Sequence, residues 1–363
     1  MPLLQTPCHS WHVARGGRMV DFAGWDMPVQ YNSIVAEHHA VRRAAGLFDI
    51  AHMGRLKFSG ADAAKFLDYL VTNDVFSLAT GQIKYALVTN ASGGILDDVL
   101  VYRQVDCHLL VVNASNRLKI LNWIEQHRGK FAVTVEDQTI SHFMLALQGP
   151  QAHALLQPLV DTDLAQIKYY FGTPANVMGQ AGFVSRTGYT GEDGFEVIVP
   201  AANASTLWEA LIAAGAPNGL LPAGLGCRDT LRLEAGMPLY GHELNETIDP
   251  FTAGLAFGVR LDAGEFIGRE ALVAAKTNPN RPRRVGIELA SKRIAREGAI
   301  VFDGETQAGR VTSGTFSPTL EKSIAMAYVA APQAAVGTPL TVDIRGQREP
   351  AKVVKLPFYK RAV

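Results

Sequence analysis

The chain has 363 residues, of which 48% are hydrophobic and 19% charged, and its 34 basic and 34 acidic residues give a formal net charge of zero. This composition is typical of a soluble globular enzyme and is too apolar for a disordered chain. Because duplex-binding proteins usually carry a basic excess, the balanced charge disfavours nucleic acid as a partner. Single hydrophobic cores stop growing at roughly 250–300 residues, so we expect at least two domains.

Signals for secretion, disulfides and membrane insertion are weak. Cys8, Cys107 and Cys227 form no C-x-x-C pair, which favours a reducing compartment. No apolar run reaches the ~18 residues that a membrane span requires. The N-terminus lacks the long apolar core of a secretory signal. We therefore expect a cytoplasmic protein with no membrane partner.

Strand-like and helix-like patterns alternate through the first two thirds of the chain. Residues 109–115 predict a buried strand. Residues 116–127 predict a helix after it, with an apolar stripe of Leu118, Leu121, Trp123 and Ile124 at helical spacing. Residues 143–150 repeat the strand pattern, and residues 202–215 predict an amphipathic helix with Ser205 as its N-cap. These units predict an α+β fold of mixed sheets with helices packed on one face.

The last quarter of the chain has a different pattern. After the polar stretch 276–284, short β-rich segments such as VGIELA, SIAMAYV and PLTVDI are separated by turns that contain Gly, Pro and Ser. Several short strands without long helices predict a small barrel or sandwich. We therefore expect a first region over residues 1–275 and a C-terminal β-barrel-like domain over residues 285–363.

Two adjacent acids, Asp97 and Asp98, lie on a strand predicted within NASGGILDDVLVYR, residues 90–103. Side chains alternate along a strand, so the two acids face opposite sides of the sheet, each among apolar neighbours. A carboxylate is costly to bury there unless it is paired or used. From the pattern alone, a functional acid and a hairpin cap beside a solvated acid are equally supported.

A second candidate segment is RTGYTGEDGFEVIVP, residues 186–200, with glycines three residues apart. It contains no G-x-G-x-x-G phosphate motif. The glycines allow tight turns that can present Tyr189 and a carboxylate to a pocket. On composition alone, an ordinary hairpin loop with solvated acids is the better supported alternative.

A third candidate is the helix predicted over residues 227–234. Its Arg228 is suited to bidentate binding of a carboxylate, whereas Asp229 and Arg232, three residues apart, can form a structural ion pair. The sequence has no H-E-x-x-H motif, no zinc-ligand spacing and no G-x-S-x-G nucleophile elbow. These absences disfavour a zinc enzyme and a serine hydrolase.

Taken in order, these segments resemble the T-protein family of the glycine cleavage system, which are folate-dependent aminomethyltransferases. The resemblance covers essentially the whole chain and ends in PFYKR at residues 357–361. The segments that carry it are MVDFAGWDMPVQY, FDIAHMG, TND, NASGGILDD, RTGYTGEDGFE, AGLGCRDTLRLEAGMPLYG and TSGTFSPTLEKSIAMAYV.

The resemblance implies three domains around a central channel, the last of them barrel-like. It also implies the reaction. An aminomethyl group on the dihydrolipoyl arm of H-protein gives its one-carbon unit to the co-substrate tetrahydrofolate. The products are ammonia, 5,10-methylenetetrahydrofolate and the reduced lipoyl H-protein.

Individual residues receive roles by the same resemblance. Asp98 is implied as the catalytic carboxylate at the folate N5/N10 edge, where it can stabilise a developing iminium or assist proton transfer. Glu196 is implied to accept hydrogen bonds from the pterin amino group and ring N–H. No metal and no covalent protein nucleophile are implied. The other implied folate-binding residues are Arg228, Tyr189, Tyr85, Met53, Asn113 and, in the C-terminal tail, Arg361.

Two departures from the family and two alternative functions accompany this interpretation. Family members commonly have serine at the position of Ala51, and a small residue other than cysteine at that of Cys227. One alternative is a related tetrahydrofolate-dependent demethylase, although the GMPLYGHEL segment is closer to the T-protein pattern. The other is a non-enzymatic folate-binding protein of iron–sulfur cluster assembly, whose K-G-C-[FY]-x-G-Q-E motif this chain lacks.

Overall fold

The computed structural model describes residues 2–362, which divide into two compact units built from separate stretches of sequence. The chain passes between the units inside strands β5 (Ile83–Thr89) and β6 (Ile95–Arg103) and inside helix α7 (Leu225–Glu234). The first unit contains the chain as far as Leu70, Asp74–Ala86 and Asp98–Arg228, and the second contains Val71–Asn73, Leu87–Asp97 and the chain from Asp229.

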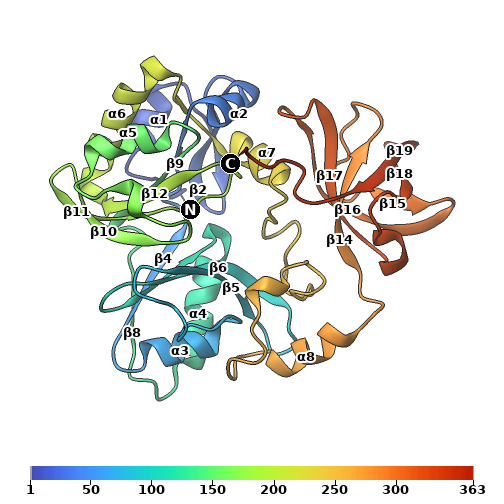
Figure 1. Ribbon diagram of the computed structural model, residues 1–363, viewed down its shortest axis with the longest axis horizontal. Coiled ribbons are helices and arrows are strands. Elements are labelled where there is room, and N and C mark those ends of the chain that lie inside the picture. Colours follow the sequence, from blue (N-terminus) through green and yellow to red (C-terminus); the bar gives the residue numbers. More distant parts are fainter. Residues whose placement is uncertain (1, 363) are drawn as a thin grey trace. The chain divides into compact units, whose positions relative to one another are not determined.

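The first unit contains a six-stranded sheet in the order β10-β11-β12-β9-β3-β13 (Figure 1). Helices α5 (Ala152–Leu156) and α6 (Ala204–Gly215) pack against its strands, and Leu145, Leu147 and Trp208 are fully buried in the shared core. The strands are β3 (Gly46–Asp49), β9 (His142–Gln148), β10 (Gly172–Val177), β11 (Gln180–Ser185), β12 (Gly194–Pro200) and β13 (Leu221–Pro222).

The predicted strand over 143–150 and the predicted helix over 202–215 are both present, but the predicted cap is wrong. Asn203, not Ser205, is the residue before the first turn of α6. A 3-10 turn over Ala201–Asn203 runs directly into the helix, which places Ser205 inside it. The N-terminal elements of this unit are α1 (His9–Ala14), β1 (Arg18–Phe22), β2 (Trp25–Gln30) and α2 (Ile34–Arg43).

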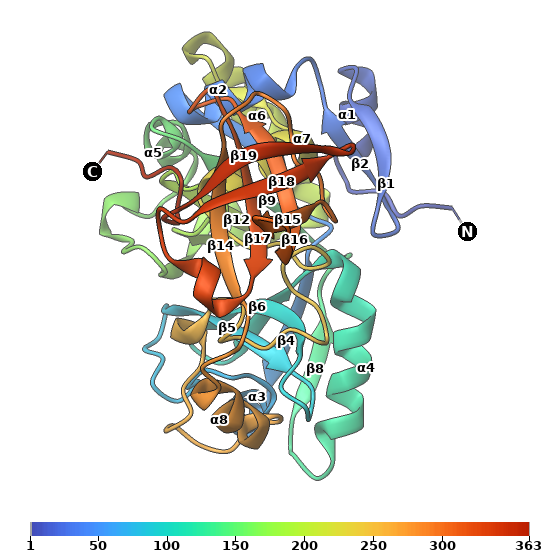
Figure 2. The same ribbon diagram turned by 90° about the vertical axis from the view of Figure 1, so that its right-hand side faces the viewer.

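A five-stranded sheet has the order β5-β6-β7-β4-β8, with β4 (Gly54–Ser59), β7 (His108–Val112) and β8 (Thr134–Asp137). Helix α3 (Ala63–Leu70) contacts β4, and α4 (Arg117–Arg128) runs alongside the sheet (Figure 2). The strand and helix predicted over 109–127 are therefore present. The apolar stripe of the helix differs from the prediction, because Leu118 is 71% exposed whereas Ile120 and Ile124 are buried.

The second unit contains a closed six-stranded barrel in the order β14-β17-β16-β15-β18-β19 (Figure 2, orange to red). Its interior is filled by small and branched side chains, among them Ile287, Val301 and Ala325. Helix α8 (Arg269–Thr277) precedes it. Its strands are β14 (Arg283–Leu289), β15 (Ile300–Asp303), β16 (Thr306–Ser317), β17 (Lys322–Val329), β18 (Pro339–Ile344) and β19 (Gln347–Val354).

The α+β class with mixed sheets and a C-terminal barrel is thereby confirmed. The division into regions 1–275 and 285–363 stays a prediction. Within residues 2–362, the helices are too short or too polar to cross a bilayer.

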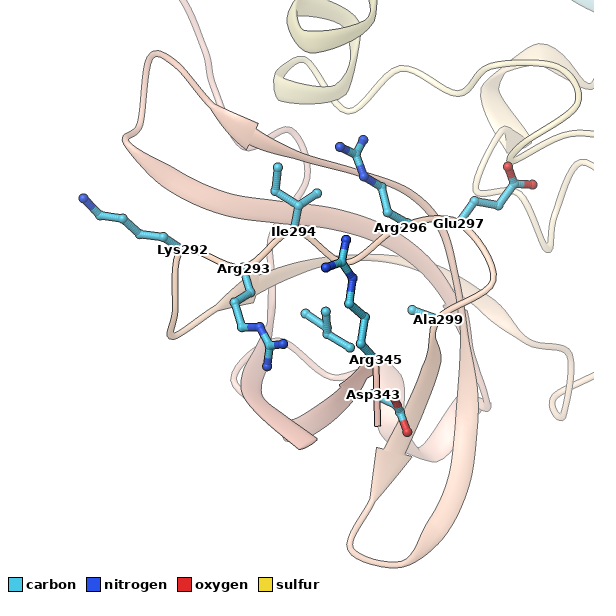
Figure 3. Close-up of a pocket in the computed structure, with 9 residues that line it drawn as sticks. Lys292, Arg293, Ile294, Arg296, Glu297, Ala299, Asp343 and Arg345 are labelled. Atoms are coloured by element: carbon cyan, nitrogen blue, oxygen red, sulfur yellow. The ribbon is translucent and has the colours of Figure 1, made fainter. Parts of the chain in front are cut away.

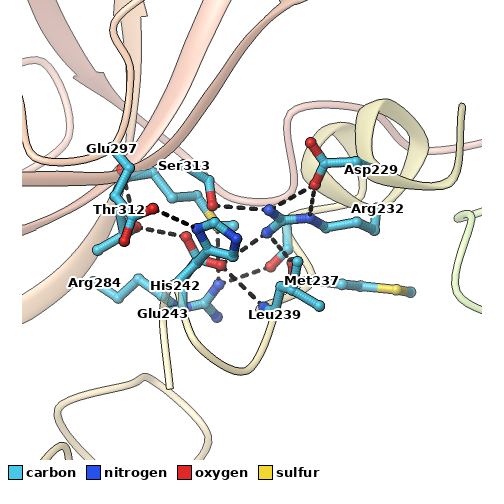
Figure 4. A network of polar contacts seen from close by, with 12 residues as sticks. Asp229, Arg232, Met237, Leu239, His242, Glu243, Arg284, Glu297, Thr312 and Ser313 are labelled. Carbon is cyan, nitrogen blue, oxygen red and sulfur yellow. Dashed lines mark hydrogen bonds and ion pairs between the residues drawn. The ribbon is translucent and has the colours of Figure 1, made fainter. Parts of the chain in front are cut away.

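A buried ion pair ties the end of α7 to the barrel within the second unit (Figure 4). The Arg232 guanidinium donates to Glu243 Oε2, to Ser313 Oγ and to Asp229 Oδ1, each at 2.8 Å. The predicted pairing of Asp229 with Arg232 is thus present. Although burial opposes ionisation, Arg232 lowers the pKa of Glu243 below its usual value. The stabilisation is therefore present above the pKa of an unfolded glutamate and is lost as pH falls through the lowered value.

The variant Arg232→Met is expected to lower the free energy of unfolding by about 3–5 kcal/mol, because Glu243 then stays buried without its cation. Urea unfolding at neutral pH measures the change. The matched control is Asp229→Asn, whose half-exposed side chain contributes about 1 kcal/mol or less. Equal losses in the two variants would contradict the dominant role of Glu243.

Candidate functional site

Asp98 lies in the middle of β6 and accepts hydrogen bonds from residues of the neighbouring strands. Tyr85 Oη donates to Asp98 Oδ2 at 3.1 Å, and Asn113 Nδ2, just after β7, donates to Asp98 Oδ1 at 2.8 Å. Asp98 is half-buried, whereas Asp97 is fully buried. The structure therefore brings three of the predicted site residues together and places neither acid in the fully solvated position of the hairpin-cap alternative.

The surroundings of Asp98 move the pKa of its carboxyl group toward neutral pH. Burial raises the pKa of Asp98 to about 6, although Tyr85 and Asn113 both act in the opposite direction by donating to the charged form. A carboxyl group with such a pKa gains or loses a proton close to neutrality. This property suits general acid–base chemistry and marks functional sites more often than structural ones.

Glu196 lies on β12 with only 6% of its surface exposed. Thr187 Oγ1 donates to Glu196 Oε2 at 2.5 Å, and Tyr102 Oη approaches the same oxygen at 3.5 Å. Burial raises the pKa of Glu196, opposed by Thr187 and by the Arg228 charge. Tyr102 is four residues after Asp98 on β6, so the face of β6 that carries Asp98 is the face directed at Glu196.

Arg228 on α7 is the cation of this region. Its guanidinium carbon lies 4.7 Å from the centroid of the Tyr189 ring, within the range of a cation–π interaction. Burial lowers the pKa of Arg228, and the charges of Tyr189 and Glu196 oppose that shift. The predicted residues Glu196, Arg228 and Tyr189 therefore form one electrostatic group in the first unit.

The loop between β11 and β12 is held by ion pairs. Arg42 donates to the Thr190 carbonyl at 2.8 Å and to Glu192 Oε1 at 2.9 Å, and Arg186 Nε donates to Asp193 at 2.9 Å. A Cβ at position 188 would lie 2.0 Å from the buried Gln148 side chain, which would have to shift from its hydrogen bonds with Thr187 and Thr190. The alternative of an ordinary loop with solvated acids is therefore wrong.

The other two predicted folate-binding residues, Met53 and Arg361, lie in different units of the chain. Met53 is half-buried in the turn between β3 and β4, where Arg55 Nη1 donates to its carbonyl at 2.6 Å. Ala51 in the same turn is buried and lines a cavity of about 320 Å³ with Thr6, Trp25 and Thr139. Arg361 belongs to the second unit. Folate contacts of Met53 and Arg361 stay predictions.

Three residues beside the two carboxylates were not singled out from the sequence. They are Tyr102 and Thr187, which contact Glu196, and Tyr170. Burial raises the pKa of Tyr170, as do the charges of Tyr169, Glu196 and Asp98, so both acids act electrostatically on the Tyr170 hydroxyl. Tyr102 could have been found from the alternation of β6, since it shares the face of Asp98. Tyr170 carries no such pattern; its left-handed backbone, with φ of 60°, is visible only in the structure.

The barrel carries a separate polar cavity of about 500 Å³ (Figure 3). Lys292, Arg293, Arg296 and Arg345 line it together with the carboxylates of Glu297 and Asp343, and none of the predicted site residues does. Arg293 is already paired with Glu349 at 2.8 Å. Mixed exposed charges of this kind are typical of a solvated protein surface.

Within residues 2–362, no three His, Cys, Asp or Glu side chains lie together in a way that could bind a metal ion. Cys8, Cys107 and Cys227 are buried, and none of the three is part of a disulfide.

Comparison with known proteins assigns the chain to a family. Residues 8–263 match the family model of the GCVT N-terminal domain, and residues 283–360 match that of the glycine cleavage T-protein C-terminal barrel domain. The chain belongs to the glycine cleavage T-protein family. The resemblance inferred from the motifs is thereby confirmed.

Relatives of this T-protein chain match it over nearly their whole length. An aminomethyltransferase of Streptomyces avermitilis is 49% identical, covering 98% of this chain and 97% of the relative. An aminomethyltransferase of Moorella thermoacetica is 48% identical, with coverage of 99% and 98%. The crystal structure of glycine cleavage system aminomethyltransferase T from Bartonella henselae is 34% identical with a TM-score of 0.92, and covers 99% of this chain and 98% of that one. The protein is therefore an aminomethyltransferase.

Replacing Asn113 with leucine is expected to raise the pKa of Asp98 from about 6 by about one unit, because the charged form loses a donor. Carbon-13 NMR of labelled aspartate follows the titration. Tyr102→Phe is the matched control, since Tyr102 lies on the same strand face but contacts Glu196. An unchanged Asp98 pKa in Asn113→Leu would show that this hydrogen bond does not stabilise the charged form of Asp98.

Proposed function

We propose that this aminomethyltransferase takes its one-carbon unit from the aminomethylated dihydrolipoyl arm of H-protein and gives it to tetrahydrofolate. In balanced form, the carbon–sulfur bond and the carbon–nitrogen bond of the aminomethyl group are broken. Two bonds to folate nitrogens form, and ammonia and the lipoyl thiol leave. We also propose that the protein works in the cytoplasm, which the reduced state of its three cysteines supports.

The observation that carries this proposal is that a half-buried carboxyl group with a pKa near neutrality, Asp98, shares one face of β6 with Tyr102, which donates to the buried Glu196. Asp98, with a pKa of about 6, is mostly ionised at neutral pH and can accept a proton from a folate N–H. Its negative charge also stabilises the cationic iminium that develops as ammonia leaves. Tyr85 and Asn113 hold the carboxylate in place for both roles.

The second part of the proposal assigns folate binding to the group around Glu196. A buried carboxylate with a raised pKa gains hydrogen bonds and recovers its charge when two N–H donors approach it. The pterin amino group and ring N–H present two such donors side by side. Arg228 and Tyr189 add a cation and an aromatic face, which suit an oxygen acceptor and a flat ring. Met53 is a further proposed folate contact in the first unit.

The demethylase and iron–sulfur alternatives have less support. The relatives at 48–49% identity are named aminomethyltransferases and match this chain from end to end. Function depends on the site rather than on the shared fold. The motifs of this chain that contain Asp98, Glu196 and Arg228 follow the T-protein pattern.

Asp98→Asn is expected to lower turnover about 100-fold or more, because the variant can neither accept the proton nor carry the charge. Ammonia release from aminomethylated H-protein and tetrahydrofolate measures turnover. In the same assay, absence of ammonia release by the unaltered protein would show that the proposed reaction is wrong.

The matched control is Asp97→Asn, the neighbouring acid on the opposite face of β6. It is expected to act through stability, because Asp97 is fully buried, so turnover per folded molecule stays near normal. If Asp97→Asn abolished turnover while Asp98→Asn did not, the assignment of strand faces to function would be reversed.

Glu196→Gln is expected to weaken tetrahydrofolate binding about tenfold or more, because a charged acceptor of two N–H donors becomes a mixed donor and acceptor. Calorimetry gives the dissociation constant, and steady-state kinetics should show a raised folate KM with a smaller change in kcat. Unaltered folate affinity would remove Glu196 from the pterin contact.

A further inference from the structure

Helix α2 (Ile34–Arg43) carries two charged side chains that are shielded from solvent, Glu37 in its first turn and Arg42 in its last. Glu37 is 1% exposed, and the side chain of Arg42 is 4% exposed. A charge is costly to bury unless it is hydrogen-bonded or paired. The partners of these two side chains therefore show what the helix holds in place.

Glu37 accepts hydrogen bonds from two backbone amides in other segments of the first unit. Its Oε2 accepts from the Gly224 amide at 2.9 Å, and its Oε1 accepts from the Tyr31 amide at 2.7 Å. Burial raises the pKa of Glu37, and these amide donors, with Gly224 foremost, oppose that shift. The carboxylate thus joins the first turn of α2 to the residue that directly precedes α7.

Gly224 connects this carboxylate to Arg228. The Arg228 amide donates to the Gly224 carbonyl at 3.0 Å, a hydrogen bond of the first turn of α7. A Cβ at position 224 would lie 2.5 Å from the Val29 carbonyl in β2, and one at position 226 would lie 2.5 Å from the Ile34 side chain. Glycine at these positions lets α7 begin in close contact with β2 and α2. The backbone of Arg228 is therefore held against α2.

The last turn of α2 holds the segment that contains Tyr189, the aromatic partner of Arg228. Arg42 Nη1 donates to the Thr190 carbonyl at 2.8 Å and to Glu192 Oε1 at 2.9 Å. The Glu192 side chain is only 5% exposed, and charge-assisted hydrogen bonds of this kind are about twice as strong as neutral ones. Thr190 directly follows Tyr189 in the chain. The anchored carbonyl is therefore one residue away from the ring that Arg228 contacts.

We propose that Glu37 and Arg42 are positioning residues of the folate site. Together they set the geometry of the Arg228–Tyr189 pair, in which the guanidinium carbon lies 4.7 Å from the ring centroid. Glu37 acts through the start of α7, and Arg42 acts through the loop between β11 and β12. The inference rests on the proposed function, which makes Arg228 and Tyr189 folate contacts.

A single helix that holds both partners has a physical advantage for binding. The cation and the ring belong to segments far apart in the chain, and each would lose conformational freedom if folate had to bring them together. Because α2 orders both segments in advance, that cost is not subtracted from the binding free energy. A residue that acts only through another also loses its effect when the other is removed. This property separates a positioning role from a general effect on folding.

The first test is a double-mutant cycle of Glu37→Gln with Arg228→Met in the full-length protein. Calorimetry gives the dissociation constant of tetrahydrofolate. We expect Glu37→Gln alone to weaken binding about fivefold, because the amide oxygen can replace only one of the two carboxylate acceptors. In the Arg228→Met background, we expect the same change to weaken binding about twofold or less.

The second cycle combines Arg42→Met with Tyr189→Leu, and we expect the same pattern, a loss of about fivefold that falls to about twofold or less. If Arg42→Met does not fold, Arg42→Lys supplies the same cycle with a smaller loss, since it keeps a cation for Glu192 but not the guanidinium geometry. Arg43→Met is the matched control. Arg43 is the next residue of α2 and is exposed, so its replacement should leave the affinity unchanged in every background.

Equal losses in the parent and in the Arg228→Met or Tyr189→Leu background would overturn the positioning role of the residue in that cycle. An unaltered affinity in Glu37→Gln and Arg42→Met would overturn both roles. In either case, tetrahydrofolate binding and ammonia release by the unaltered protein would leave the proposed function standing. Failure of the unaltered protein to bind tetrahydrofolate would contradict the proposed function and this inference with it.

Discussion

Burial of carboxylates in a partly apolar interior is the constraint on which the rest of this structure depends. Each buried acid has a different set of partners, and the partners decide its protonation. Glu243 faces the Arg232 guanidinium and has a lowered pKa. Asp98 is surrounded by the neutral donors of Tyr85 and Asn113, and its pKa rises to about 6. A full cation makes an acid structural, whereas neutral donors leave it able to exchange a proton.

The same constraint explains why two adjacent acids, Asp97 and Asp98, have different environments. Strand geometry directs Asp97 and Asp98 to opposite faces, and the chain passes from the second unit to the first between them. Asp97 is fully buried and Asp98 is not. A single-residue slip in the register of β6 would exchange the two side chains between faces. The pairing of β6 with β7, for example Leu100 with Val111, holds that register.

The sequence was sufficient for the fold class and for the strand that carries Asp98, because apolar alternation and turn residues are local signals. The barrel was predicted for the same reason. The N-cap of α6 and the apolar stripe of α4 were not predicted correctly, since a preceding 3-10 turn and tertiary packing decide them. Periodicity could not predict Thr187 or Tyr170. Thr187 meets Glu196 across the loop between β11 and β12, whereas Tyr170 and Asp98 act on each other electrostatically from segments far apart in the chain.

The folate-binding group that we propose in the first unit contains a buried acid, Glu196, which burial holds toward its protonated form. The turn that contains Met53 supplies a second proposed contact. Meanwhile the backbone around them is fixed by Arg42, Arg55 and Arg186. Rigid elements can keep such groups desolvated in advance, so that a ligand with complementary donors and acceptors meets no reorganisation cost. These contacts therefore hold the proposed site in place before a ligand binds.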